Sequence, residues 1–185
     1  MPTVTVDVNA ISGDTGHFNV NSATVLARAS DGDTGTTFFN TSGNKSLTFG
    51  LEDVSDIAGI SGATLNSLLP VVTAAAGGKG AMEFTIELVN SDGVVNGPVD
   101  GGSSNGTQLD YEGETANLST FTQAQFNDLS IRYTTTNNTQ PIVSRVRAVL
   151  DYTVAVIVNP GFSLSNAYLG INGEMNLDSG QINLN

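Results

Sequence analysis

The sequence predicts an all-β protein, built as an antiparallel two-sheet sandwich followed by a C-terminal arm. Apolar and polar residues alternate with a period of two in several stretches, which is the pattern of strands that bury one face. Turn-forming pairs such as Asp92-Gly93 and Asn96-Gly97 recur between these stretches. Stretches with a helical period are scarce. Together the three observations are typical of sandwiches and barrels.

Residues 3–8 and 81–89 show the clearest strand pattern, because every second side chain in them is apolar. Residues 17–27 also alternate, but their apolar positions change parity, which predicts a strand with a β-bulge near Asn21-Ser22. Weaker strands are expected at residues 46–51, 68–75, 107–111 and 116–118.

Two segments favour short helical turns, and we expect no further helix. Residues 122–129 follow Thr120 and Thr122, either of which would cap a helix N-terminus. Residues 53–58 end at glycines that would stop a turn. Residues 91–106 are rich in Gly, Ser, Asn and Asp, which predicts a long exposed loop.

A hairpin is expected near the end of the sandwich. Residues 130–134 alternate strongly, and a polar turn at 135–141 leads to a long apolar strand at 143–158. Because the two strands are consecutive, we expect them to pair with each other. The expected core combines the inward side chains of the best strands. They are Phe84, Ile86, Leu88, Ile131, Val146, Leu150 and Val154.

Three of the six basic residues lie on this expected hairpin, on the face opposite its apolar side chains. They are Arg132, Arg145 and Arg147. Asp128, Asp151 or a neighbouring subunit would supply the opposite charge. The simplest interpretation is a solvated polar face with weak ion pairs.

The chain is predicted to form a β-sandwich domain over residues 1–159 and a C-terminal arm or edge-strand segment over residues 160–185. The second segment is rich in Asn and Gly yet too apolar for a solvated tail. It therefore either completes the sandwich with short strands or extends onto a neighbouring subunit. Its candidate interface residues are Phe162, Leu164, Tyr168, Leu169, Ile171, Leu177, Ile182 and Leu184.

The composition excludes several classes of protein. Six basic and 18 acidic residues give a net charge of −12, and so acidic a surface does not grip phosphates, so we expect no nucleic-acid binding. No apolar run is long enough to cross a membrane, and residues 1–7 lack the features of a signal peptide. The chain has no cysteine, which excludes disulfides, thiolate catalysis and cysteine-based zinc sites.

We expect no enzyme, and we assign no catalytic, cofactor-binding or metal-binding residue. Ser12, Asp14 and His17 supply the residue types of a catalytic triad, but neighbours on one strand and turn cannot surround a substrate. Paired carboxylates such as Glu83 with Glu87 would suit a glycosidase. A glycosidase site normally also has aromatic platforms, and this chain has no Trp.

The segment Asp31-Gly32-Asp33-Thr34-Gly35 resembles the start of a calcium loop. An EF-hand needs Gly at loop position six and Glu at position twelve, and this chain has Thr36 and Ser42 there. A turn is therefore the preferred interpretation. A looser Ca²⁺ site formed by Asp31, Asp33 and a carbonyl is the alternative.

Two stretches resemble the closing portion of jelly-roll-like β-sandwich proteins of tailed-phage virions. Residues 120–133 contain a threonine, a short helical segment, Asn-Asp-Leu and a strand with an arginine, and residues 143–154 form a valine-rich strand that ends near Tyr152. The acidic, cysteine-free composition rich in Thr, Asn, Gly and Ser also resembles phage capsid-decoration and tail proteins. The apolar segment after Pro160 has no counterpart in this resemblance.

The resemblance implies a structural virion protein, first of all a capsid decoration or cement protein that stabilises a phage head through intersubunit contacts. Its partners would be further copies of itself, in a homo-oligomer, and a major capsid or tail protein. It would be located in the virion after synthesis in the host cytoplasm. The alternatives are a phage tail, neck or baseplate component and a glycan-binding lectin or adhesin module. A lectin needs aromatic side chains in a cleft, for which Tyr111 and Tyr133 are the candidates.

Overall fold

The computed structural model of the chain describes residues 2–19, 22–31, 37–39, 44–60, 62–76, 82–102, 106–136 and 141–154. Ten strands lie within these ranges. They are β1 (Thr3–Gly13), β2 (Phe38–Phe39), β3 (Lys45–Leu51), β4 (Thr64–Ala76), β5 (Phe84–Asn90), β6 (Gly93–Gly101), β7 (Leu109–Glu112), β8 (Ala116–Asn117), β9 (Ser130–Thr135) and β10 (Pro141–Thr153). The helical elements are the 3₁₀ turns η1 (Thr15–His17) and η2 (Val54–Asp56) and the helices α1 (Ser22–Ser30) and α2 (Gln123–Asn127).

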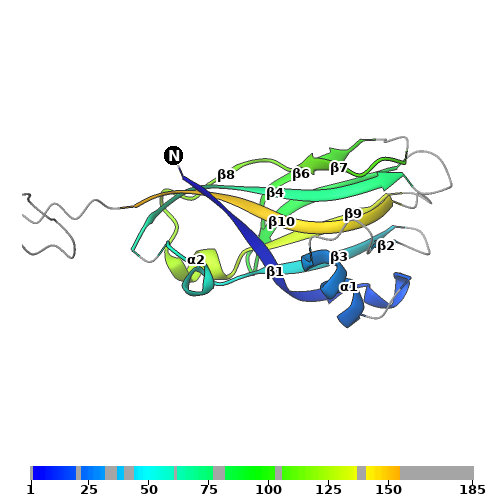
Figure 1. Cartoon of the computed structure of the whole chain (residues 1–185), viewed down its shortest axis with the longest axis horizontal. Helices are drawn as coiled ribbons and strands as arrows, with labels where there is room; N and C mark the ends of the chain where they lie inside the picture. Colours follow the sequence, from blue (N-terminus) through cyan, green and yellow to red (C-terminus); the bar gives the residue numbers. More distant parts are fainter. Residues whose placement is uncertain are drawn as a thin grey trace, which may run out of the picture. The chain divides into compact units, whose positions relative to one another are not determined.

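The strands form two antiparallel sheets that share strand β1. The first half of β1, from Thr3 to Asp7, pairs with β10, and the second half, from Val8 to Gly13, pairs with β3. An irregularity between Val8 and Ala10 separates the halves, and Figure 1 shows β1 running obliquely across the other strands. The continuous order is β6-β5-β9-β3-β1-β10-β4-β7, with β2 on β10 and β8 on β4. The expected antiparallel, jelly-roll-like β-sandwich is therefore confirmed, and it is nearly closed.

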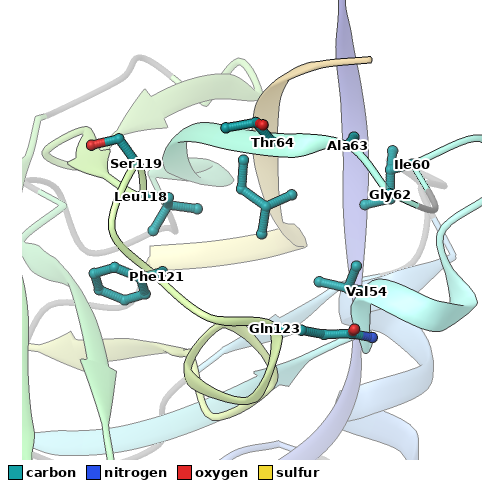
Figure 2. Close-up of a pocket in the computed structure, with 10 residues that line it drawn as sticks. Val54, Ile60, Gly62, Ala63, Thr64, Leu118, Ser119, Phe121 and Gln123 are labelled. Carbon is teal, nitrogen blue, oxygen red and sulfur yellow. The ribbon is translucent and has the colours of Figure 1, made fainter. Parts of the chain in front are cut away.

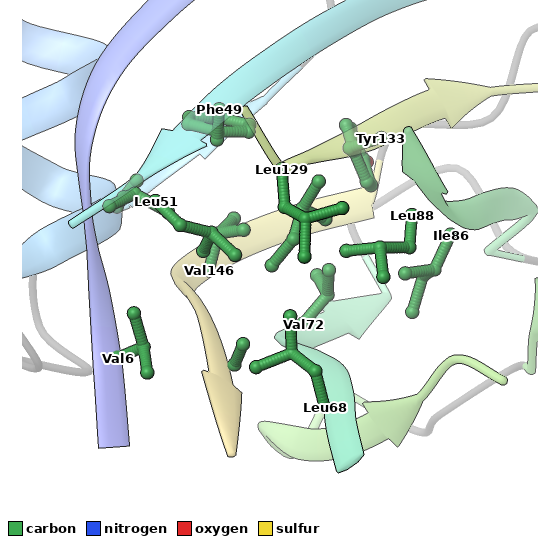
Figure 3. Close-up of a cluster of buried hydrophobic side chains, with 14 of the residues drawn as sticks. Val6, Phe49, Leu51, Leu68, Val72, Ile86, Leu88, Leu129, Tyr133 and Val146 are labelled. Carbon is green, nitrogen blue, oxygen red and sulfur yellow. The ribbon is translucent and has the colours of Figure 1, made fainter. Parts of the chain in front are cut away.

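The core lies between the two sheets, where side chains from β1, β3, β4, β5, β9 and β10 meet (Figure 3). Six of the expected core residues are buried. They are Phe84, Ile86, Leu88, Ile131, Val146 and Leu150. The seventh, Val154, was wrongly placed, because β10 ends at Thr153 and the Val154 side chain is 52% exposed.

The expected hairpin between residues 130–134 and 143–158 is wrong. Strand β9 pairs with β3 and β5, and β10 pairs with β1 and β4, so the two strands lie in opposite sheets. This arrangement places the apolar side chains of the two strands on facing sheets, so that they meet across the interior. The long strand itself is confirmed from Pro141 to Thr153.

The three arginines of these strands lie on outward faces, as expected, but with other partners. Arg132 bonds Glu87 at 2.5 Å, from Nε to Oε2. The Arg145 guanidinium lies 3.0 Å from Asp7, and that of Arg147 lies 2.6 Å from Asp110. Asp128 and Asp151 are two of the three alternatives considered as partners; each arginine pairs instead with an acidic residue of another strand. Asp128 instead accepts hydrogen bonds from the Ser91 backbone N–H and hydroxyl, at 3.0 and 2.6 Å.

The strand expected over residues 17–27 is also wrong, because the segment forms η1 and then α1. Val25 and Ala29 are buried at helical spacing, so the change of apolar parity marks a helix rather than a bulge. Arg28 at the end of α1 donates to the Thr37 carbonyl. Helix α1 is therefore additional to the two short helical turns that we expected. Those two turns are present as η2 and α2.

The long loop expected over residues 91–106 is instead mostly strand β6, which pairs with β5. The turn between them is the predicted Asp92-Gly93, and Asn90 Oδ1 accepts from both backbone N–H groups at 3.0 Å. Gly97 lies within β6 rather than in a turn, at φ +103°, with the Ile86 carbonyl 2.9 Å from where its Cβ would be. An edge strand with irregular register tolerates such a polar, glycine-rich sequence. The weaker strands are confirmed, with changed bounds, as β3, β4, β7 and β8.

Some expectations fall on residues outside the described ranges. They are the boundary between residues 159 and 160, the eight candidate interface residues from Phe162 to Leu184, and Asp33 of the calcium alternative. In the described part of the chain, no helix is long and apolar enough to cross a membrane.

Candidate functional site

A pocket of about 310 Å³ opens where β4 begins, between the segment around η2 and the segment that leads into α2. Figure 2 shows side chains of both segments around it, and Figure 1 shows α2 at one end of the sandwich and α1 towards the other. Its lining residues are Val54, Ile60, Gly62, Ala63, Thr64, Leu65, Leu118, Ser119, Phe121 and Gln123.

The pocket has an apolar floor and a polar rim. Ile60, Leu65 and Leu118 are buried and continue the core of the sandwich. Val54 and Phe121 are half-buried and form facing walls, as Figure 2 shows. The polar residues of the lining are Thr64, Ser119 and Gln123, which are exposed; the Ser119 hydroxyl points away from Val54 and Phe121 in Figure 2. A ligand with an apolar face and a polar edge would be complementary to this arrangement.

Hydrogen bonds hold the η2 side of the pocket in place. The Ala63 backbone N–H donates to the Ile60 carbonyl at 2.9 Å and closes the turn before β4. The Val54 backbone N–H donates to Asn127 Oδ1 at 3.0 Å. This bond joins η2 to α2 although the two residues are far apart in the sequence, so Asn127 is a positioning residue for the Val54 wall.

The side of the pocket that carries Phe121 is equally constrained. The Leu118 backbone N–H donates to the Asn66 carbonyl at 2.8 Å, and the Phe121 N–H donates to the Leu118 carbonyl at 2.8 Å. Helix α2 then begins with a capping box between Thr122 and Gln125. Thr122 is thus the N-cap, one of the two predicted alternatives. Because these bonds already order the loop, it loses little conformational entropy when a ligand binds.

A second pocket, of about 260 Å³, is lined by Glu83, Phe84, Asp100, Gly101 and Thr136. It lies where β5 begins and β6 and β9 end. Glu83 and Asp100 are the acidic residues of its lining. Within the described ranges, no group of three or more His, Cys, Asp or Glu residues is placed to hold a metal ion.

The residues considered for a catalytic triad have structural positions. Asp14 follows β1, and its Oδ2 accepts from the Ser46 backbone N–H at 3.2 Å, which ties the end of β1 to β3. His17 is exposed at the end of η1. Ser12 lies within β1, paired with Thr48. Of the paired carboxylates, Glu87 is held by Arg132 on the outer face of the sheet that contains β5 and β9.

Neither tyrosine considered as a sugar platform lines the pocket between η2 and α2. Tyr133 is completely buried, and burial raises the pKa of its hydroxyl well above the usual value. Tyr111 is half-buried, and its ring meets Phe84 edge-on with centroids 5.4 Å apart. The aromatic side chain at an opening is instead Phe121. In the sequence, Phe121 stands out only as an aromatic residue just before a helix N-cap. Nothing in the sequence indicates that it lies beside the η2 segment.

The search of protein-family models and the search of curated proteins found no match. Solved structures are similar to this chain at low identity. One is a truncated AlyQ with CBM32 and alginate lyase domains, with 14% identity and a TM-score of 0.48 over 83% of this chain; the chain spans only 34% of its length. Another is the CBM32 of AlyQ in complex with 4,5-unsaturated mannuronic acid, with 13% identity, a TM-score of 0.46, and coverage of 78% of this chain and 97% of that chain.

A third similar structure is a family 35 carbohydrate binding module from Clostridium thermocellum. It shows 14% identity and a TM-score of 0.42, and the match covers 80% of this chain and 98% of that chain. At these identities and TM-scores, function has to be argued from the pocket itself.

Proposed function

We propose that the protein is a non-catalytic glycan-binding domain that holds the end of a saccharide in the pocket between η2 and α2. The observation that carries the proposal is the combination of a buried apolar floor, the Phe121 wall and an uncharged polar rim. A pyranose ring has apolar C–H faces and a rim of hydroxyl groups, so it matches such a lining. A few placed polar groups around an apolar pocket are typical of small-molecule sites.

The size of the pocket favours a short ligand. Small-molecule sites have volumes of about 300–1,000 Å³, and this pocket, at about 310 Å³, lies at the lower end. One or two sugar units therefore fit better than a long segment of polysaccharide. The proposal is a terminal-sugar site rather than an extended groove.

The test is a titration of the full ¹⁵N-labelled chain with a panel of mono- and disaccharides, followed by amide chemical shifts. We expect shifts at Val54, Thr64, Ser119 and Gln123 and little change at β7. Gln123→Ala removes an exposed amide without touching the core and should weaken binding about tenfold, the effect of losing one good hydrogen bond. Phe121→Ala should weaken it further.

Leu109→Ala is the matched control, because Leu109 is an exposed apolar residue on β7, remote from the pocket. It should leave saccharide affinity unchanged. Thermal unfolding of each variant separates a loss of binding from a loss of fold, which matters for the half-buried Phe121. A full panel without any shift at the pocket would refute the proposal.

The virion function implied by the sequence resemblance stays a second prediction. Its candidate interface residues lie outside the described ranges, so the geometry of the sandwich does not bear on it. A chain ending at residue 159 should stay folded yet lose oligomerisation or capsid attachment. Unchanged assembly of that shortened chain would contradict the prediction.

A further inference from the structure

We infer that the pocket selects neutral saccharides and discriminates against uronic acids and other anionic sugars. This inference rests on the proposed function and names the ligand class of the same site. It comes from the charges around the pocket, which are unevenly distributed.

The lining offers no counter-charge to a carboxylate. None of the ten lining residues is charged, and the polar side chains among them, Thr64, Ser119 and Gln123, are neutral. An anionic sugar that enters would lose water from its carboxylate and gain at most neutral hydrogen bonds. Desolvation of an ionised carboxylate without a paired cation is strongly unfavourable. A neutral hydroxymethyl group carries no such cost.

The segment of this chain that contains η2 adds negative charge beside the pocket. Val54 forms one wall of the pocket, and the same segment carries Glu52, Asp53 and Asp56. Asp56 is exposed, while Glu52 and Asp53 are half-buried. The repulsion between such carboxylates and a second anion is screened only in part at short range.

The arginines of the neighbouring strands lie far from the pocket and are already paired. Along β10, Arg147 pairs in register with Val71 and Arg145 with Thr73, whereas the pocket uses Thr64 and Leu65 of the same strand β4. Six or more residues at about 3.3 Å each place these arginines roughly 20 Å or more away. Arg147 is paired with Asp110 and Arg145 with Asp7. Neither is positioned to hold a uronate in the pocket.

The experiment compares matched sugars with the full chain by the same NMR titration. Each neutral methyl hexoside is paired with its uronate and with its uronamide, which keeps the size of the carboxyl group without its charge. We expect the neutral hexoside to bind about tenfold more tightly than the uronate, the effect of one unpaired, partly desolvated charge. The uronamide should recover most of the loss.

Two variants place a charge at the rim. Gln123→Lys gives the pocket a cation and should raise uronate affinity, while Gln123→Glu should lower it further; both change the same exposed side chain. If the wild-type chain binds a uronate as tightly as its neutral partner or more tightly, the inference is overturned while the proposed function stands. If neither neutral nor anionic sugars shift the pocket amides, the proposed function fails instead.

Discussion

The interior of the sandwich and the pocket at its end are stabilised by different kinds of interaction. Strands β4 and β10 pair along almost their whole length and bury apolar side chains such as Leu68 and Leu150. The pocket segments are instead joined by single hydrogen bonds, one from the Val54 N–H to Asn127 Oδ1 and one from the Leu118 N–H to the Asn66 carbonyl. Apolar packing makes the interior costly to disturb. The pocket depends on a few polar atoms, so we expect one substitution there to change its shape while the sandwich stays folded.

The largest effect is expected in the interior. Leu150 is completely buried and lies opposite Val4 on one side and Leu68 on the other. Leu150→Ala should lower the free energy of unfolding by about 2–5 kcal/mol, because it leaves a cavity between the sheets. Urea denaturation measures this. Leu109→Ala, at a 48% exposed position, should change stability by less than about 0.5 kcal/mol; equal losses at both positions would contradict the contrast.

A smaller and more local effect is expected at the pocket. Asn127→Ala removes the acceptor of the part-buried Val54 N–H, which should cost about 1–3 kcal/mol. The Val54 amide should also exchange its hydrogen faster, and saccharide affinity should fall because the Val54 wall is no longer held. Asn127→Asp keeps the acceptor oxygen and should preserve both properties. Slow exchange at Val54 in the alanine variant would show that Asn127 does not position this wall.

The smallest effect is expected at the ion pair between Asp110 and Arg147. Burial raises the pKa of Asp110, but hydrogen bonds from Arg147 and Thr73 and the arginine charges outweigh it, so the pKa falls below its ordinary 3.8. The resulting stabilisation is present above the unfolded-state pKa and is lost as pH falls through the folded-state pKa. The Asp110 side chain is 50% exposed, so solvent screening limits it to about 0.2–1 kcal/mol.

Asp110→Asn isolates this contribution. The difference in unfolding free energy between the natural chain and the variant should be constant near neutral pH and should vanish in strong acid. Denaturation curves collected from pH 7 to pH 2 measure it. A difference that grows on acidification would show that the sign of the pKa change is wrong.

The same contrast separates what sequence reveals from what it does not. The period of two in residues 81–89 predicted β5 and its buried face, because strand alternation is a local property. The strand prediction for residues 17–27 is wrong because Val25 and Ala29 also fit a helical period, and short apolar segments satisfy both patterns. The placement of β9 and β10 in opposite sheets depends on which strands lie beside each of them. The order of the strands along the sequence does not show this.

The sequence did not predict the pocket, for a related reason. Its two halves lie around Val54 and Phe121, which are separated by strands β4 to β8, and only the folded sandwich brings them together. Tyr133 is one of the two aromatic candidates for a lectin cleft, yet its alternation with Ile131 places it inside the core. An aromatic side chain on the inward face of a strand contributes a large buried apolar area to the core.

The sharing of β1 between the sheets has a consequence for the time course of folding. Thr3 lies opposite Asp151, so the first described strand completes its pairing only with the last. Closing so long a loop has a high entropic cost, and domains dominated by such non-local contacts fold in milliseconds to seconds rather than microseconds. During synthesis, β3 is available to the second half of β1 early, while the first half must wait for β10. We therefore expect the sandwich to close only after most of the domain has emerged from the ribosome.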